Sequence, residues 1–173
     1  AAGVYWAVDA GAQVVNVSVE VPETSGVLKH AIDYAHDRGV LLVAAAGNGG
    51  RSEVTFPARY GGVVAVAAVT EGGVAAPFTN FGSAVSVVAP GVAMLGVMLF
   101  DVASAGTARW SGTSFAAPVV SGVAALVRAR FPALSREAVR KRIEAAATPV
   151  DALNPSLVGR LGRGLVNAAA AVS

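Results

Sequence analysis

Ser114 stands at a position where a serine hydroxyl can act as a nucleophile. It follows Gly112 and Thr113 and opens a long, mostly apolar segment that is predicted to be helical from Thr113 to Arg130. The first turn of a helix leaves backbone N–H groups without intrahelical acceptors and carries the positive end of the helix dipole. Because such a position can hold a developing oxyanion, the sequence predicts nucleophilic catalysis at Ser114.

The residues around Ser114 form a wider pattern, Gly-Thr-Ser-x-Ala-x-Pro-x-x-x-Gly, over residues 112–122. This pattern resembles the serine motif of the subtilisin-like serine proteases (subtilases). Residues 39–50 form an apolar strand that ends in Gly-Asn-Gly. In the family such a strand ends at the asparagine whose side-chain amide donates to the oxyanion, so the resemblance assigns that role to Asn48. Further matches in family order cover essentially the whole chain, at residues 14–18, 88–91 and 162–167.

The resemblance also implies where a peptide or protein substrate would bind. In the family, the edge segment that matches residues 18–20 pairs with the substrate backbone by β-augmentation. The residues at the end of the Asn48 strand would form one wall of the specificity pocket, and the residue before Phe56 would line its floor. The substrate-binding residues implied in this way are Ser18, Val19, Glu20, Ala45, Ala46, Gly47, Thr55 and Thr113.

Two of these residues, Glu20 and Thr55, differ from the residues that a wide, open pocket would need. Glu20 stands where the family has a glycine that lets the substrate approach closely, so either a neighbouring insertion shifts the register or the cleft is partly blocked. A glutamate there is also compatible with a preference for basic substrate side chains, and the plain alternative is an ordinary loop glutamate. Thr55 would narrow the pocket and favour small or medium side chains.

A weak cation site is the one metal site that the resemblance implies. The carbonyls of Ala58, Tyr60 and Val63 match a weak site in some subtilases, and carbonyl ligands suit Ca²⁺ or Na⁺. No carboxylate cluster accompanies them, so we expect no firm metal site. A structural calcium or sodium ion is the one cofactor that the resemblance leaves open. The neighbouring Phe56–Pro57 pair matches a family position with a cis peptide bond.

The chain contains no evident base for Ser114. The subtilase triad runs Asp, His, Ser along the chain, and the family's Asp-Thr/Ser-Gly and His-Gly-Thr motifs do not occur in this sequence. Its two histidines, His30 and His36, are six residues apart, do not share a helical face and have charged neighbours, which predicts a solvated surface. Since a serine hydroxyl without a positioned base is a weak nucleophile, we expect very low protease activity from this chain alone.

The first residues already have the pattern of a helix. We therefore expect residues 1–173 to be a partial subtilase catalytic domain without the upstream Asp and His segments: a fragment, a processed chain or one half of a split protein. A missing N-terminal half or a partner chain would supply the rest of the triad. The alternative is a pseudoprotease or interaction module that binds a partner through its cleft or an exposed sheet edge.

Composition excludes several other functional classes. The net charge of +2 is too small to argue for nucleic acid binding, and the absence of cysteine excludes disulfides and thiolate metal sites. Two long uncharged stretches, residues 72–100 and 110–127, are interrupted by proline, glycine and polar residues, so we expect no membrane span. The arginines between residues 128 and 142 are expected on a solvated helix face. The resemblance implies an exported or extracellular protein.

Helical and strand patterns alternate along the chain, which predicts an α/β fold with a mostly parallel sheet flanked by helices, subtilisin-like but incomplete. The resemblance places the strand at residues 13–18 at an exposed edge of this sheet. A short hairpin is expected around Val97–Phe100. Helices are predicted at residues 2–10, 25–38, 113–130, 135–147 and 166–172, and strands at 13–18, 40–45, 63–69 and 86–89.

Overall fold

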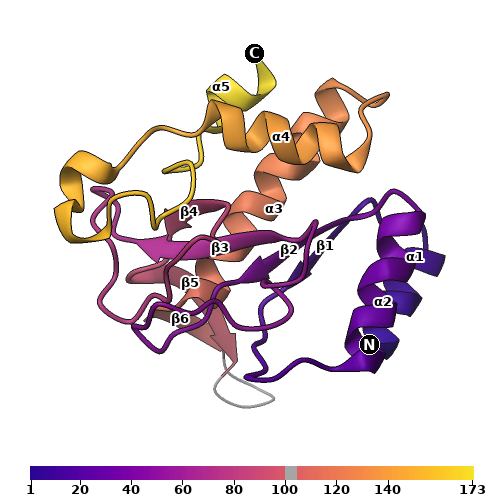
Figure 1. Cartoon of the computed structure of the whole chain (residues 1–173), viewed down its shortest axis with the longest axis horizontal. Coiled ribbons are helices and arrows are strands. Elements are labelled where there is room, and N and C mark those ends of the chain that lie inside the picture. The colour runs from indigo at the N-terminus through magenta and orange to yellow at the C-terminus, as the bar shows by residue number, and fades with distance from the viewer. Residues whose placement is uncertain (100–104) are drawn as a thin grey trace.

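A four-stranded parallel sheet forms the centre of the chain. The computed structural model describes residues 1–99 and 105–173 (Figure 1). The strands lie in the order β1-β2-β3-β4, and each pairs in parallel with the next strand along the sequence. Their bounds are Val14–Val17 (β1), Leu41–Ala45 (β2), Val64–Val69 (β3) and Val87–Pro90 (β4).

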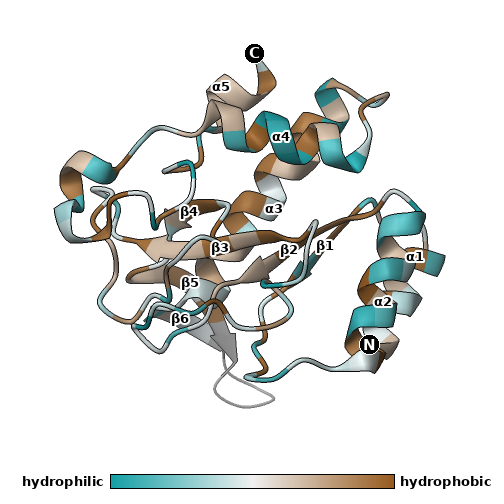
Figure 2. Ribbon diagram, in the orientation of Figure 1, coloured by the Kyte–Doolittle hydropathy of each residue, from teal (hydrophilic) through white to brown (hydrophobic). Residues whose placement is uncertain are grey.

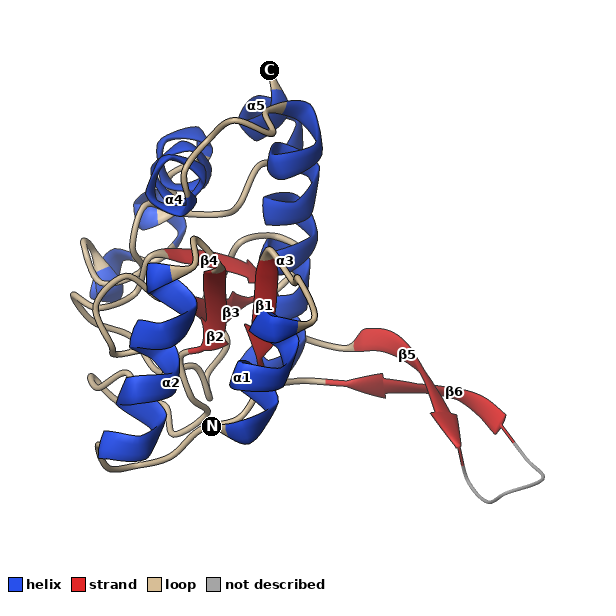
Figure 3. Cartoon of the chain, turned by 90° about the vertical axis from the view of Figure 1, so that its right-hand side faces the viewer, coloured by secondary structure: helices blue, strands red, loops and turns tan. Residues whose placement is uncertain are grey.

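Helices cover both faces of this sheet. In Figure 3 the sheet lies between α2 on one side and α3 on the other. The hairpin of β5 (Met94–Leu99) and β6 (Ala105–Trp110) projects away from the body. The helices are α1 (Ala2–Asp9), α2 (Gly26–Asp37), α3 (Thr113–Arg130), α4 (Arg136–Ala146) and α5 (Ala168–Val172), with short 3-10 turns at Asp151–Leu153 and Pro155–Leu157.

The two faces of the sheet belong to different hydrophobic clusters. Successive side chains of a strand point to opposite faces, so Leu42 and Ala44 of β2 pack with α1 and α2, whereas Leu41 and Val43 pack with α3 and α4. β2 and β3 are buried at every position, as expected for parallel strands with helices on both faces. The predicted α/β architecture is confirmed.

Local capping sets the boundaries of the helices that flank the sheet. The Ser25 hydroxyl accepts a hydrogen bond from Leu28 N at 3.3 Å at the start of α2, and Ser135 accepts one from Ala138 N at 3.2 Å at the start of α4. Gly39 follows α2 with a φ of 73°, which favours glycine. Figure 2 shows brown, apolar central strands, while α2 and α4 alternate between teal and brown. Ser25 and Ser135 thus lie where the sequence predicts these two helices to begin.

Two local predictions need correction, and one feature was not predicted. The hairpin pairs over six positions on each strand, longer than expected, and Phe100 lies outside the described residues. α5 begins at Ala168, because Asn167 caps it through Ala170 N at 3.0 Å while Val166 N donates to Val88 O of β4. The two 3-10 turns were not predicted.

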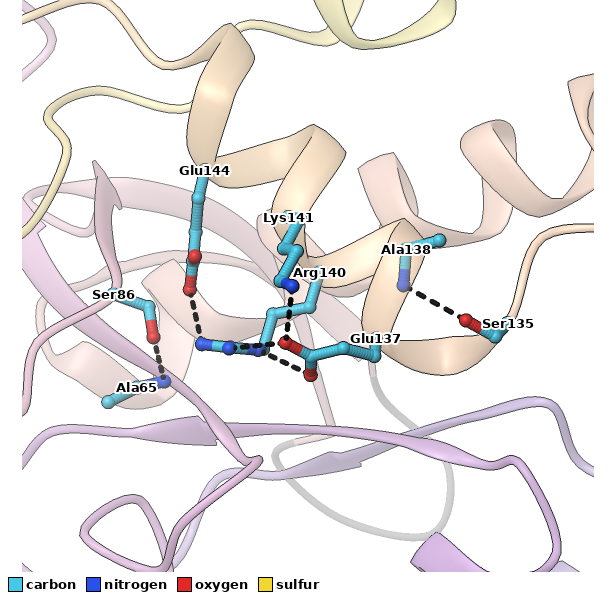
Figure 4. A network of polar contacts seen from close by, with 8 residues as sticks. All are labelled: Ala65, Ser86, Ser135, Glu137, Ala138, Arg140, Lys141 and Glu144. Carbon is cyan, nitrogen blue, oxygen red and sulfur yellow. Dashed lines mark hydrogen bonds and ion pairs between the residues drawn. The ribbon is translucent and has the colours of Figure 1, made fainter.

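The arginines near α4 are not simply solvated. Figure 4 shows the Arg140 guanidinium between two carboxylates, with Nη2 2.7 Å from Glu137 Oε1 and Nη1 2.8 Å from Glu144 Oε1. Arg128 donates to Gly39 O at 2.6 Å and Arg136 donates to His36 O at 3.1 Å. Arg128 and Arg136 tie α3 and α4 to the α2 side of the molecule, whereas Arg140 pairs within α4. These three side chains are half-buried, so the prediction of a fully solvated face is wrong for them.

Candidate active site

Ser114 lies in the first turn of α3, directly beyond the carboxyl ends of the parallel strands. The helix is positioned by close packing at its start, where Gly112 N donates to Gly91 O at 2.8 Å. A Cβ on Gly91 would lie 2.8 Å from both Ala68 Cβ and Gly112 O, so the chain segments can approach this closely only because residue 91 is glycine. The close approach therefore depends on Gly91, since a Cβ on Gly112 would make only ordinary contacts.

Asn48 follows β2 and reaches the same helix start. Its Oδ1 accepts hydrogen bonds from the backbone N of Thr113 at 2.8 Å and from Thr113 Oγ1 at 3.0 Å. Because these two hydrogen bonds fix Oδ1, they also fix the position of Nδ2 at the other end of the same amide group. Within residues 1–99 and 105–173, neither Asn48 Nδ2 nor the Ser114 backbone N–H donates to a protein acceptor. Two unused donors thus lie on neighbouring segments at the candidate nucleophile.

Thr113 connects these segments. It is fully buried, its hydroxyl donates to Asn48 Oδ1, and it accepts a hydrogen bond from Gly47 N at 3.2 Å. One hydroxyl therefore fixes both the end of β2 and the orientation of the Asn48 amide. Thr113 acts on the geometry of the site as a positioning residue.

The Ser114 hydroxyl donates to a backbone carbonyl. Ser114 Oγ lies 3.1 Å from Ser18 O, and Ser18 Oγ in turn donates to Ser114 O at 2.8 Å. This pair of hydrogen bonds holds the segment after β1 beside Ser114. Val19, the next residue, is 65% exposed, so the segment is accessible to a binding partner.

The predicted pocket residues also meet near Ser114. Thr55 Oγ1 lies 3.2 Å from Ala46 O and 3.3 Å from Glu20 Oε2. Gly47 has a φ of 108°, and a Cβ there would lie 2.6 Å from Glu20 Oε2. Ala45, Ala46 and Thr55 are buried, whereas Glu20 is exposed. The structure therefore places Glu20, Gly47 and Thr55 in direct contact.

Asn80 is a structural residue of the site that the sequence analysis did not select. It is fully buried, its Nδ2 donates to Ala46 O at 3.2 Å, and its Oδ1 accepts from Gly49 N at 2.9 Å. It therefore holds the two residues on either side of the Gly47-Asn48 turn. The signal available in the sequence was the polar Thr79-Asn80 pair inside an otherwise apolar segment.

The two histidines lie away from Ser114. Both belong to α2, which covers the face of the sheet opposite α3. His30 is exposed, but the expectation of a solvated surface is wrong for His36, whose Nε2 is buried without a hydrogen-bond partner among the described residues. Burial, and then the positive charge of Arg136, lower the pKa of His36. Neither histidine hydrogen bonds to Ser114 in the part of the chain that the structure describes.

The predicted cation site has a mixed environment. Ala58, Tyr60 and Val63 line a cavity of about 620 Å³. Its charged lining residues are Arg59, Arg140, Arg163, Glu144 and Asp151. The Tyr60 carbonyl already accepts from Val63 N at 3.2 Å. Arg140 and Arg59 are paired with carboxylates, so the lining carries charges of both signs and the cation site stays a prediction. In the described part of the chain, no three His, Cys, Asp or Glu side chains gather in a way that could hold a metal ion. The Phe56–Pro57 bond is cis, as the resemblance implied.

Comparison with known proteins agrees with this geometry. The profile of the Subtilase family matches residues 1–164. The chain belongs to the subtilase family. Among curated relatives, this subtilase is 41% identical over 172 residues to a thermostable alkaline protease of Halalkalibacterium halodurans, and 38% identical over 171 residues to subtilisin BL of Lederbergia lenta. These alignments cover 97% and 99% of the chain.

The subtilase chain corresponds to only part of each relative. It spans 44% of the Halalkalibacterium protease and 60% of subtilisin BL. Among solved structures, the prenylagaramide maturation protease superposes with a TM-score of 0.88 at 34% identity, covering 99% of this chain and 64% of that protein. Among the described residues, no helix has both the length and the apolar character needed to cross a bilayer.

Proposed function

We propose that this chain is the nucleophile-bearing part of a serine endopeptidase. Ser114 Oγ adds to the carbonyl carbon of a peptide bond, and Asn48 Nδ2 and the Ser114 backbone N–H donate to the oxyanion that forms. Collapse of the tetrahedral intermediate expels the amine and leaves an acyl-enzyme, which water then hydrolyses. The hydrogen bonds from Thr113 to Asn48 Oδ1 carry this proposal, because they leave the amide donor free beside Ser114.

We expect the base that removes the proton from Ser114 Oγ to lie outside residues 1–173. Both of its histidines lie on α2, on the other face of the sheet from α3. We therefore infer that another segment of the same protein, or a partner chain, supplies a histidine and an aspartate next to Ser114. Without them, the oxyanion donors retain only a small residual rate enhancement.

The sheet edge is where such a segment would join. β1 is an edge strand in the described sheet, and its valines are partly exposed. An unpaired apolar edge favours pairing with another strand. The same proposal includes export from the cell, supported by the likeness to enzymes named subtilisin and alkaline protease.

One observation supports a second candidate function. The Ser114 hydroxyl donates to Ser18 O, an arrangement that holds the hydroxyl away from attack. A pseudoprotease that binds a partner through the β1 edge or the cleft would need no base. This alternative predicts tight binding without hydrolysis.

Hydrolysis of casein separates the two functions. The longest product of the gene that contains this chain is compared with the 173-residue chain alone and with the Ser114→Ala variant of the longer product. The protease proposal predicts activity in the longer product, very little in the chain alone and none in Ser114→Ala. A folded longer product that binds casein without cleaving it contradicts the proposal.

A further inference from the structure

Glu20 lies in a short segment that is fixed at both ends beside the nucleophile. At one end Ser18 exchanges two hydrogen bonds with Ser114, at 2.8 and 3.1 Å. At the other end Val21 exchanges two backbone hydrogen bonds with Phe56, at 2.8 and 3.1 Å. Glu20 therefore has little freedom to leave the neighbourhood of Ser114, although its side chain is exposed.

The Glu20 carboxylate is part of a group of oxygen acceptors. Its Oε2 lies 3.3 Å from Thr55 Oγ1, whose single proton can go either to the carboxylate or to Ala46 O at 3.2 Å. Ala46 O also accepts from Thr55 N at 3.0 Å and from Asn80 Nδ2 at 3.2 Å, so the carboxylate is the acceptor that is short of donors. Thr55 is only 4% exposed, so its hydroxyl forms the buried side of the group. We call Glu20, Ala46 and Thr55 the acceptor corner.

The acceptor corner carries a negative charge without a cationic partner. Among the described residues, the ion pairs involve Asp33, Glu53, Glu137 and Glu144, and none involves Glu20. An ammonium or guanidinium group has donors only, so it would complement the charge and donate to the oxygens of the Glu20 carboxylate.

A substrate bound at Ser114 would bring a side chain to this corner. The two segments that flank the substrate carbonyl are residues 18–20 and 45–48, because Ser18 contacts Ser114 and Gly47 contacts Thr113. A substrate whose carbonyl is held by Ser114 and Asn48 would place the side chain of that residue between these segments. Glu20 of the first segment approaches Gly47 of the second there, since a Cβ on Gly47 would lie 2.6 Å from Glu20 Oε2. We infer that Glu20 makes the enzyme prefer a lysine or arginine residue on the acyl side of the bond it cleaves. This inference rests on the proposed endopeptidase function.

A test that needs no catalysis is an NMR titration of the folded, ¹⁵N-labelled 173-residue chain. The probes are n-butylammonium, which mimics a lysine side chain, and the uncharged 1-butanol. We expect n-butylammonium to shift the amide signals of Gly47 and Thr55. Glu20→Gln is expected to weaken its binding about tenfold or more, because a charged hydrogen bond is lost. Binding of 1-butanol should be the same in both chains.

Glu23→Gln is the matched control. Glu23 is an exposed glutamate of the same loop, and among the described residues it makes no hydrogen bond or ion pair with the acceptor corner. This variant should bind n-butylammonium as the unchanged chain does. If Glu20→Gln binds n-butylammonium equally well or better, or if the shifts appear elsewhere, Glu20 only obstructs the cleft and the inference is wrong.

The titration and the proposed function fail separately. Binding of n-butylammonium involves no reaction at Ser114, so the titration does not depend on the endopeptidase function. If the longer gene product does not hydrolyse casein, the endopeptidase function is overturned, but the cation preference of Glu20 can still be measured. In the active product, Glu20→Gln should reduce the ratio of cleavage after lysine to cleavage after norleucine in matched peptides, with Glu23→Gln unchanged.

Discussion

Asn48 Oδ1 accepts two hydrogen bonds from Thr113, one from its backbone N at 2.8 Å and one from its hydroxyl at 3.0 Å. This double contact decides which end of the Asn48 amide faces the site. It joins the end of β2 to the first turn of α3, so the two proposed oxyanion donors are brought together by the parallel sheet and the helix that packs on it. A site of this kind is preorganised, because the donors need no rearrangement when charge develops.

Asn48→Asp tests the amide donor with little change in packing. The substitution keeps an acceptor for Thr113 but replaces the Nδ2 donor with a carboxylate oxygen. In the active form of the protein we expect kcat to fall by about 10²–10³, a range that is known from loss of the corresponding donor in subtilisin, with KM little changed. Steady-state kinetics on a peptide substrate provides the measurement, and circular dichroism should be unaltered. An unchanged kcat would remove Asn48 from the oxyanion site.

Thr113→Val tests the hydroxyl that positions Asn48. It leaves Gly47 N without a partner at a buried position and removes one of the two hydrogen bonds to Asn48 Oδ1, while the bond from the backbone N of residue 113 remains. We therefore expect the free energy of unfolding to fall by about 1–3 kcal/mol. Urea denaturation measures this loss. Thr113→Ser keeps the hydroxyl and should recover most of the stability and the rate of covalent labelling at Ser114. Equal losses in both variants would point to packing of the Thr113 methyl group instead.

His36 predicts a pH dependence of stability. Burial and the nearby Arg136 lower its pKa below the ordinary value of 6.5, so the unfolded chain binds the proton more tightly than the folded one. The free energy of unfolding should therefore be highest above pH 6.5 and fall as the pH drops below it. Urea titrations between about pH 7.5 and about pH 5 test this.

The matched variants for this prediction are His36→Gln and His30→Gln. His36→Gln should lose that part of the pH dependence, whereas His30→Gln, at an exposed position of the same helix, should keep it. The reverse pattern would show that His36 does not cause the effect.

Two glycine-to-alanine substitutions should have opposite effects on stability. At Gly91 a Cβ would lie 2.8 Å from both Ala68 Cβ and Gly112 O, so Gly91→Ala should destabilise the chain by about 1–3 kcal/mol and slow the labelling of Ser114. A Cβ on Gly122, inside α3, would enter open space, and Gly122→Ala should stabilise the chain by about 0.5–1 kcal/mol. Thermal unfolding of both variants measures the difference. Equal shifts of the same sign would contradict the packing described at Gly91.

The spacing of apolar residues and the positions of helix-capping and helix-ending residues were sufficient to predict most of the fold. The apolar runs of β2 and β3, the Ser25 and Ser135 caps and the length of α3 could be predicted because each depends on local sequence. The start of α5 could not, because the pairing of Val166 with Val88 of β4 joins segments that are far apart in the sequence. Tertiary contacts of this kind leave no local pattern.

The candidate site could likewise be predicted only where it depends on local sequence. Ser114 and Asn48 were selected from motifs, but motifs do not reveal that Thr113 orients Asn48 or that Asn80 supports the turn that carries it. The partial burial of His36 was missed for a similar reason, since Arg136 reaches it from α4 across a long sequence separation. Charged neighbours along the sequence suggested solvent, whereas the contact is made in three dimensions.

Covalent labelling at Ser114 tests the central claim most directly. The longest product of the gene is treated with an alkyl fluorophosphonate and its intact mass is measured, beside its Ser114→Ala variant and the 173-residue chain alone. We predict one adduct on the longer product, none on Ser114→Ala, and labelling of the short chain that is slower by several orders of magnitude. A folded longer product that takes up no adduct, or an adduct that persists in Ser114→Ala, would contradict the assignment of Ser114 as the nucleophile.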